Sequence, residues 1–100
     1  MEQEELELSI IEAVCSEFGV EFHEMRSPTR VRNIKDARHL AIFLLYFFTD
    51  STITKVSKRF KRHHSTSLHA IKCVRDLIEY DKQYRIKYNR VISKIQSNVN

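Results

Sequence analysis

The sequence predicts an all-α fold: a compact bundle of about five helices that contains a helix-turn-helix. The 100 residues include one glycine and one proline, too few for the tight turns of a β-protein of this length. Apolar residues recur at helical spacing along most of the chain. Hydrophobic residues make up 42% of the sequence, enough to close one core, so we expect a single domain over residues 1–100.

The first predicted helix covers about residues 4–18 and carries acid on its outer face. Its apolar residues share one side, and Gly19 supplies a stop. Residues 1–25 contain eight glutamates and no Lys or Arg. Residues 26–100 therefore contain 17 basic and five acidic residues, a net charge of +12. We interpret the glutamates as a solvated face. A docking face for a basic partner protein is the less favoured alternative.

A basic loop is predicted over about residues 26–33. The dipeptide Ser27-Pro28 breaks the helical pattern, and three arginines cluster around it: Arg26, Arg30 and Arg32. An isolated basic loop is usually just solvated.

The second predicted helix opens near Asn33, which with Asp36 resembles a capping box. Its segment from Ala37 to Phe48 is apolar nearly all round. We therefore expect it to be the central helix, with Phe43, Phe47 and Phe48 in the core.

A helix-turn-helix is predicted over about residues 52–79. Ile53, Val56 and Phe60 space its first, short helix, and a tight turn at residues 61–63 leads into the second. The second helix is apolar on one side, whereas Ser65, His69, Lys72 and Asp76 lie on the other. Its first turn contains no carboxylate, which leaves the free N–H groups open to a phosphate. This is the chemistry of a helix that reads the major groove of DNA.

The C-terminal helix is predicted over about residues 80–97. Tyr80, Tyr84 and Tyr88 form a stripe that continues into Val91 and Ile95. Aromatic stripes can stack on single-stranded bases. The aliphatic continuation favours packing on the bundle instead, with the hydroxyls at its rim.

Several other classes of protein are disfavoured. The longest apolar run has nine residues, far short of the roughly 20 that span a bilayer, and no basic-then-apolar leader opens the chain. Cys15 and Cys73 form no paired motif, so we expect a cytoplasmic protein. Of His63, His64, His69 and Cys73, only the last two share a helix face, and we expect no metal and no cofactor. With no catalytic constellation, we expect no enzyme and no small-molecule substrate.

The start of the predicted second helix of the helix-turn-helix resembles a known family. Residues 64–72, His-Ser-Thr-Ser-Leu-His-Ala-Ile-Lys, are similar to the Asp-His-Thr-Thr-Val-Leu-His-Ala signature of the DNA-binding domain of the bacterial replication initiator DnaA. Residues 37–41, Ala-Arg-His-Leu-Ala, resemble that family's Pro-Arg-Gln-Met-Ala. The resemblance covers roughly residues 8–97 and implies a Trp-repressor-like fold that binds double-stranded DNA. The initiator's ATPase phosphate loop has no counterpart here.

The resemblance also implies which residues contact DNA, and beside the signature we favour DNA contact over simple solvation for the basic loop. His64 and Ser65 match base-reading positions in the major groove, and Arg32, with Arg30 as the near alternative, matches a minor-groove arginine. Phosphate contacts are implied for Thr52, Lys55, Thr66, His69 and Lys72, and Arg62 and His63 complete the expected DNA-binding set.

The departures from the signature concern the same region. His63 replaces the family's acid, Ser65 replaces a threonine, and the preceding turn is shorter, with Lys61 and Arg62 in place of glycine. Losing the acid removes an acceptor for a cytosine amino group, and losing the threonine methyl removes a contact for thymine. The resemblance therefore does not fix the DNA sequence that is read.

The expected function is sequence-specific binding of double-stranded DNA without catalysis. The setting would be replication initiation, or origin or transcriptional regulation, in a chain encoded by a bacterium, phage or plasmid. The rival is a protein-interaction module that keeps the fold without specific DNA binding and uses its acidic first helix or its basic face.

Overall fold

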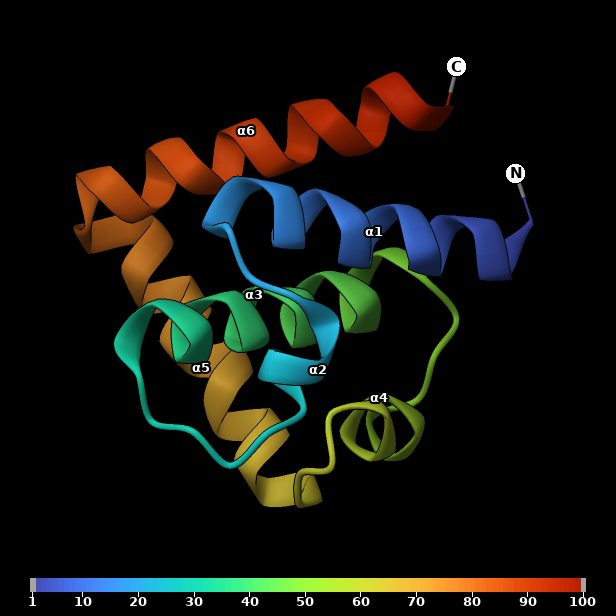
Figure 1. Ribbon diagram of the computed structural model, residues 1–100, viewed down its shortest axis with the longest axis vertical. Helices are drawn as coiled ribbons and strands as arrows, with labels where there is room; N and C mark the ends of the chain where they lie inside the picture. The colour runs from blue at the N-terminus through green and yellow to red at the C-terminus, as the bar shows by residue number, and fades with distance from the viewer. Residues whose placement is uncertain (1, 100) are drawn as a thin grey trace.

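The computed structural model describes residues 2–99, with side chains described for residues 2–96. Over this part of the chain there are six helices and no strand (Figure 1). They are α1 (Gln3–Phe18), α2 (Phe22–Met25), α3 (Arg32–Phe48), α4 (Ile53–Arg59), α5 (His64–Tyr80) and α6 (Lys82–Val99). The prediction of an all-α bundle with a helix-turn-helix is confirmed. None of the described helices is long and apolar enough to cross a bilayer.

Helix α2 was not predicted. It has four residues, too few for apolar periodicity to be visible in the sequence. The carboxylate of Glu24 accepts a hydrogen bond of 3.0 Å from the backbone N–H of Glu21 and so stabilises this single turn.

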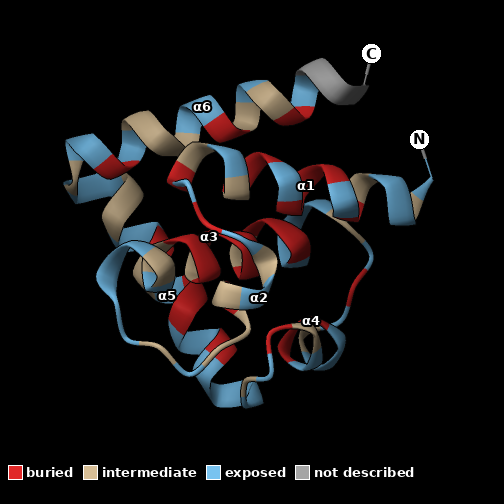
Figure 2. Ribbon diagram, viewed as in Figure 1, coloured by how far each residue is buried: buried red, intermediate tan, exposed pale blue. Residues whose placement is uncertain are grey.

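Helix α3 is the centre of the bundle, as predicted. It packs against α1, α2, α4 and α5, and Leu40, Leu44 and Leu45 are completely buried. Figure 2 shows the buried residues of α1, α3 and α5 facing one another across a shared core. This core also takes Phe60 from the end of α4 and Val91 from α6. Met25 of α2 is also completely buried in this core, so all six helices contribute to it, and the burial of their apolar side chains is the main force that holds the helices together.

The prediction for two phenylalanines of α3 is wrong. Phe47 and Phe48 are 42% and 44% exposed, and Phe43 is only half-buried. They belong to the last turns of α3, where the bundle ends. The Phe47 ring lies 4.8 Å from the Phe43 ring, and the guanidinium of Arg75 lies over it at 5.1 Å from its centre. At this end of α3 the exposed Phe47 ring is thus in contact with the cation of Arg75 and is not buried in the core.

The tyrosine stripe is also only partly buried. Tyr84 is buried against the Phe18 ring, with the two ring centres 6.4 Å apart, and Tyr88 is half-buried. Tyr80 is 80% exposed. It is the last residue of α5, and α6 begins at Lys82 in a new direction, so the stripe does not continue through one straight helix.

Two glutamates of α1 are not solvated, contrary to the interpretation of a plain acidic face. Glu7 is buried, accepts a hydrogen bond of 2.7 Å from the Ser51 hydroxyl and pairs with Arg59 at 3.0 Å. Burial would raise the pKa of Glu7, but the Ser51 hydroxyl and the charge of Arg59 hold it below its ordinary value. Glu17 pairs with Arg90 and Lys94 of α6 at 3.5 and 3.1 Å. Both carboxylates tie α1 to neighbouring helices.

The predicted capping box at the start of α3 is wrong. The residue before the helix is Val31, and Asn33 lies inside the first turn. The Asn33 side-chain amide donates a hydrogen bond of 2.8 Å to the backbone carbonyl of Phe18. It therefore ties the start of α3 to the end of α1 and leaves the first turn of α3 uncapped by a side chain.

Candidate nucleic-acid interface

Helix α5 presents a polar side to solvent. His64, Ser65, Thr66, His69 and Lys72 are all exposed. Ala70, Ile71 and Val74, on the opposite side, are buried in the core. The apolar side thus anchors the helix while hydroxyl, imidazole and amine groups stay accessible.

The first turn of α5 is open to an anion. The residue before the helix, His63, makes no side-chain hydrogen bond that caps it, and no acidic residue lies in the first turn. The free backbone N–H groups and the positive end of the helix dipole therefore face solvent together. Such an end favours a phosphate.

Helix α4 lies beside the start of α5 and carries its own exposed polar groups. The Thr52 hydroxyl accepts a hydrogen bond of 3.1 Å from the backbone N–H of Lys55 and caps α4, and both residues are exposed. The buried hydroxyls of Ser57 and Ser67 form a 2.7 Å hydrogen bond between the two helices. This buried hydrogen bond and the short turn together fix the orientation of α4 relative to α5.

The turn between the two helices is unusual for lacking glycine. Lys61 adopts a left-handed backbone conformation, with φ at 53°. A side chain in this region costs roughly 1 kcal/mol or more, a strain that glycine would avoid. The turn keeps its shape through backbone hydrogen bonds, in which the N–H groups of Lys61 and Arg62 donate to the carbonyls of Lys58 and Ser57.

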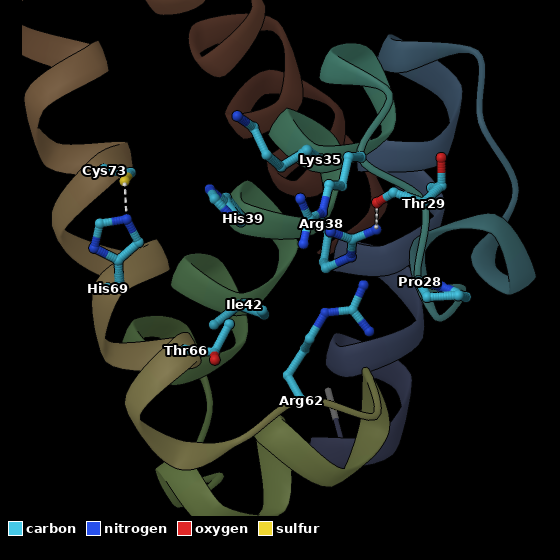
Figure 3. A pocket seen from close by; sticks show the side chains of 11 residues that line it. Pro28, Thr29, Lys35, Arg38, His39, Ile42, Arg62, Thr66, His69 and Cys73 are labelled. Carbon is cyan, nitrogen blue, oxygen red and sulfur yellow. Dashed lines mark hydrogen bonds between the residues drawn. The ribbon is translucent and has the colours of Figure 1, made fainter.

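A cleft of about 760 Å³ separates the polar side of α5 from the loop before α3 (Figure 3). Arg30 of the loop, Lys35 and His39 of α3, and Thr66 and His69 of α5 are among the residues that line it. None of the described residues that line the cleft is acidic. The cleft therefore concentrates positive potential between the loop and α5.

The structure distinguishes the two loop arginines that the sequence left as alternatives. Arg30 is exposed and lines the cleft together with residues of α5. Arg32 is the first residue of α3, lies 3.7 Å from the carboxylate of Asp36, and lines a small pocket with Tyr84 and Lys87 of α6. Arg30 therefore lines the cleft beside Thr66 and His69, whereas Arg32 lines a neighbouring pocket with Cys73 and Asp76 of α5.

Arg38 has a role that sequence reasoning missed. It is 4% exposed, and its guanidinium donates to the carbonyls of Met25, Ser27 and Thr29 at 2.6, 3.2 and 3.2 Å. Burial, together with the positive charge of Arg62, lowers the pKa of Arg38 to about 10, so the side chain stays charged at neutral pH. Its place in the segment similar to Pro-Arg-Gln-Met-Ala was the available signal, but the pattern carried no sign of burial.

Arg62 was expected to contact DNA, and its donors instead point at the protein. The guanidinium donates to the carbonyl of Ser27 at 2.6 Å and to that of Phe60 at 2.9 Å. It thus spans from the helix-turn-helix to the loop that carries Arg30. His63, next to it, is exposed.

His39 and His69 approach the same cleft from different helices. Burial, followed by the charges of Arg38 and Lys35, lowers the pKa of His39 to about 4, so its imidazole is neutral at neutral pH. His69 lies 3.3 Å from the sulfur of Cys73. Within the described part of the chain, no three His, Cys, Asp or Glu side chains are grouped in a way that could hold a metal ion.

Comparisons with known proteins agree on one family. The model of the bacterial dnaA protein helix-turn-helix matches residues 8–74. The chromosomal replication initiator protein DnaA of Rickettsia bellii is 32% identical over 85 residues, which cover 84% of this chain. The protein of the same name from Streptococcus pyogenes is 36% identical over 80 residues, or 79% of this chain. In both cases the matched segment is 18% of the length of the relative.

Proposed function

The chain belongs to the bacterial DnaA helix-turn-helix family, and from this premise we propose that it binds double-stranded DNA in a sequence-specific manner, in the setting of replication initiation. The observation that carries the proposal is that the exposed polar side of α5 and Arg30 line one cleft, whose charged lining residues are all basic. A protein that reads the major groove needs an exposed polar helix of this kind, and basic side chains beside it bind the phosphates of the duplex.

The proposal divides the interface into base readers and phosphate holders. His64 and Ser65, at the exposed start of α5, reach base edges in the major groove. Arg30 enters the adjacent minor groove, where narrow A·T-rich segments attract arginine. The phosphate holders are Thr52, Lys55, Thr66, His69 and Lys72, all exposed.

Arg30 replaces Arg32 as the favoured minor-groove residue. Arg32 pairs with Asp36 and, unlike Arg30, does not line the cleft beside the start of α5. An exposed ion pair of this kind is weak, so the assignment depends on position rather than on the strength of the pair.

The direct test is fluorescence anisotropy of labelled duplexes. A pool of random duplexes and a duplex selected from it by the protein are titrated at about 50 and about 200 mM salt, a range over which phosphate contacts lose orders of magnitude in affinity. We expect binding that falls steeply with salt and a clear preference for the selected duplex. No binding to any duplex at the lower salt would overturn the proposal and favour a protein-interaction module.

A further inference from the structure

Two arginines from different parts of the fold converge on one loop. Arg38 comes from α3 and Arg62 from the turn before α5, and both donate to the carbonyl of Ser27, at 3.2 and 2.6 Å. In Figure 3 the guanidinium of Arg62 points across the cleft toward Arg38 and the loop. The loop is thus held from two sides just before Arg30.

This arrangement places two positive charges together, which is costly. The charge of Arg62 lowers the pKa of Arg38, and neither guanidinium forms an ion pair with a described carboxylate. What the pair gains is a set of charge-assisted hydrogen bonds to carbonyls, including those of Met25 and Thr29 from Arg38. Because a buried guanidinium without partners is expensive, the loop carbonyls and the two arginines need one another.

Arg62 also binds the turn to which it belongs. One of its terminal nitrogens donates to the carbonyls of Phe60 and Lys61 at 2.9 and 3.3 Å, and the other donates to Ser27. Both terminal nitrogens of a half-buried side chain are therefore engaged within the protein. Lysine has a single ammonium and lacks the planar fork that makes these two connections at once.

We propose that Arg62 is a positioning residue, which fixes the loop so that Arg30 is presented at a set distance from the start of α5. This inference rests on the proposed DNA-binding function. A duplex has a fixed separation between a major groove and the adjacent minor groove, so a loop and a helix that are held together meet both grooves at little cost in ordering. A loose loop would pay that cost on binding.

A double-mutant cycle separates positioning from direct contact. Arg62→Met keeps an apolar stem but removes every donor, and it is combined with Arg30→Ala, with Kd measured on the selected duplex. We expect Arg62→Met to weaken binding about tenfold in the natural background and hardly at all once Arg30 is alanine. An equal loss in both backgrounds, with the salt slope reduced by about 0.9 in each, would identify Arg62 as a phosphate contact and overturn the proposal.

The control is Lys61→Met, which removes a charge from the neighbouring, exposed residue of the same turn. It is expected to cost the same factor with and without Arg30. Thermal melting followed by circular dichroism checks that the variants are folded, because a merely destabilised protein would bind more weakly in both backgrounds.

A second measurement needs no DNA and so distinguishes failure of this inference from failure of the proposed function. Trypsin cuts after Arg26, Arg30 and Arg32, and cleavage of a held loop requires local opening. We expect Arg62→Met to speed cleavage in this loop several-fold relative to Lys61→Met. Equal loop cleavage in the two variants would show that Arg62 does not hold the loop, even if the protein binds DNA as proposed.

Discussion

At the scale of single residues, four arginines that look alike in the sequence lie in four different environments. Arg30 is exposed on the cleft, Arg32 pairs with an acid in its own helix, Arg38 is buried among carbonyls, and Arg59 pairs with buried Glu7. Of these four, only Arg30 could contact a nucleic acid without giving up a contact within the protein. Charge counting overstates the cations available to DNA, because part of the positive charge holds the fold together.

His64 and Lys72 are exposed on the same helix and are expected to act differently. A base contact by His64 discriminates between sequences by about 1–3 kcal/mol, whereas a phosphate contact by Lys72 carries no sequence information. His64→Ala should therefore narrow the gap in Kd between selected and random duplexes. Lys72→Ala should weaken both duplexes by the same factor and lower the salt slope by about 0.9. Identical behaviour of the two variants across sequences would show that the division into readers and holders is wrong.

His39 is expected to make stability depend on pH. Its pKa is about 4 in the folded protein and 6.5 ordinarily, so between these values the unfolded chain binds more protons. The contribution of His39 to the free energy of unfolding is therefore complete above about pH 6.5 and is lost progressively as the pH falls from about 6.5 toward 4. In His39→Gln, the loss between about pH 7 and about pH 5 should be smaller by roughly 1–2 kcal/mol, measured by urea unfolding. Equal losses in both proteins would mean that His39 titrates normally.

At the scale of helices, the helix-turn-helix is held by a polar contact inside its interface. Ser57 of α4 and Ser67 of α5 are both buried and share one hydrogen bond. Ser67 stands where the DnaA signature has valine, so a restored valine would leave the Ser57 hydroxyl without this partner.

Ser67→Val is expected to lower the free energy of unfolding by about 1–3 kcal/mol, the cost of a buried hydroxyl that has lost its partner. Adding Ser57→Ala should recover most of that loss, because both polar groups are then gone. Chemical denaturation of the single and double variants measures the coupling. Additive losses in the double variant would show that the hydroxyl pair contributes nothing specific.

The helices that could be predicted were those long enough to show a period. The buried and exposed sides of α5 follow from its apolar spacing, and the polar side of the site was found in the same way. The four-residue α2 has no period, and the exposure of Phe47 and Phe48 depends on where the bundle ends, which spacing cannot tell. Arg30 and Arg32 are two residues apart in one basic loop, so the sequence does not separate them; that Arg30 and not Arg32 lines the cleft is visible only in the structure.

The bundle as a whole separates its charges. Figure 1 shows α1 and α6 together at the top and α4 with the first turn of α5 at the bottom. At physiological salt, exposed charges that are more than about 8 Å apart are largely screened from one another. The glutamates of residues 1–25 lower the net charge of the chain from +12 to +4, whereas no acidic residue lies in the first turn of α5 or lines the cleft beside it.

The same core joins α1 and α6 to the helix-turn-helix, and for this reason the chain is expected to unfold as one domain. The buried residues form a single cluster that includes Val14 of α1, Leu44 of α3, Val74 of α5 and Val91 of α6. Removing any helix would expose apolar surface of its neighbours, so we expect no part of the bundle to be stable alone. Calorimetry should give one transition, with an enthalpy of about 60–80 kcal/mol that equals the van't Hoff value. A separate earlier melting of α1 and α6, seen as two calorimetric peaks, would show instead that the helix-turn-helix is an independent unit.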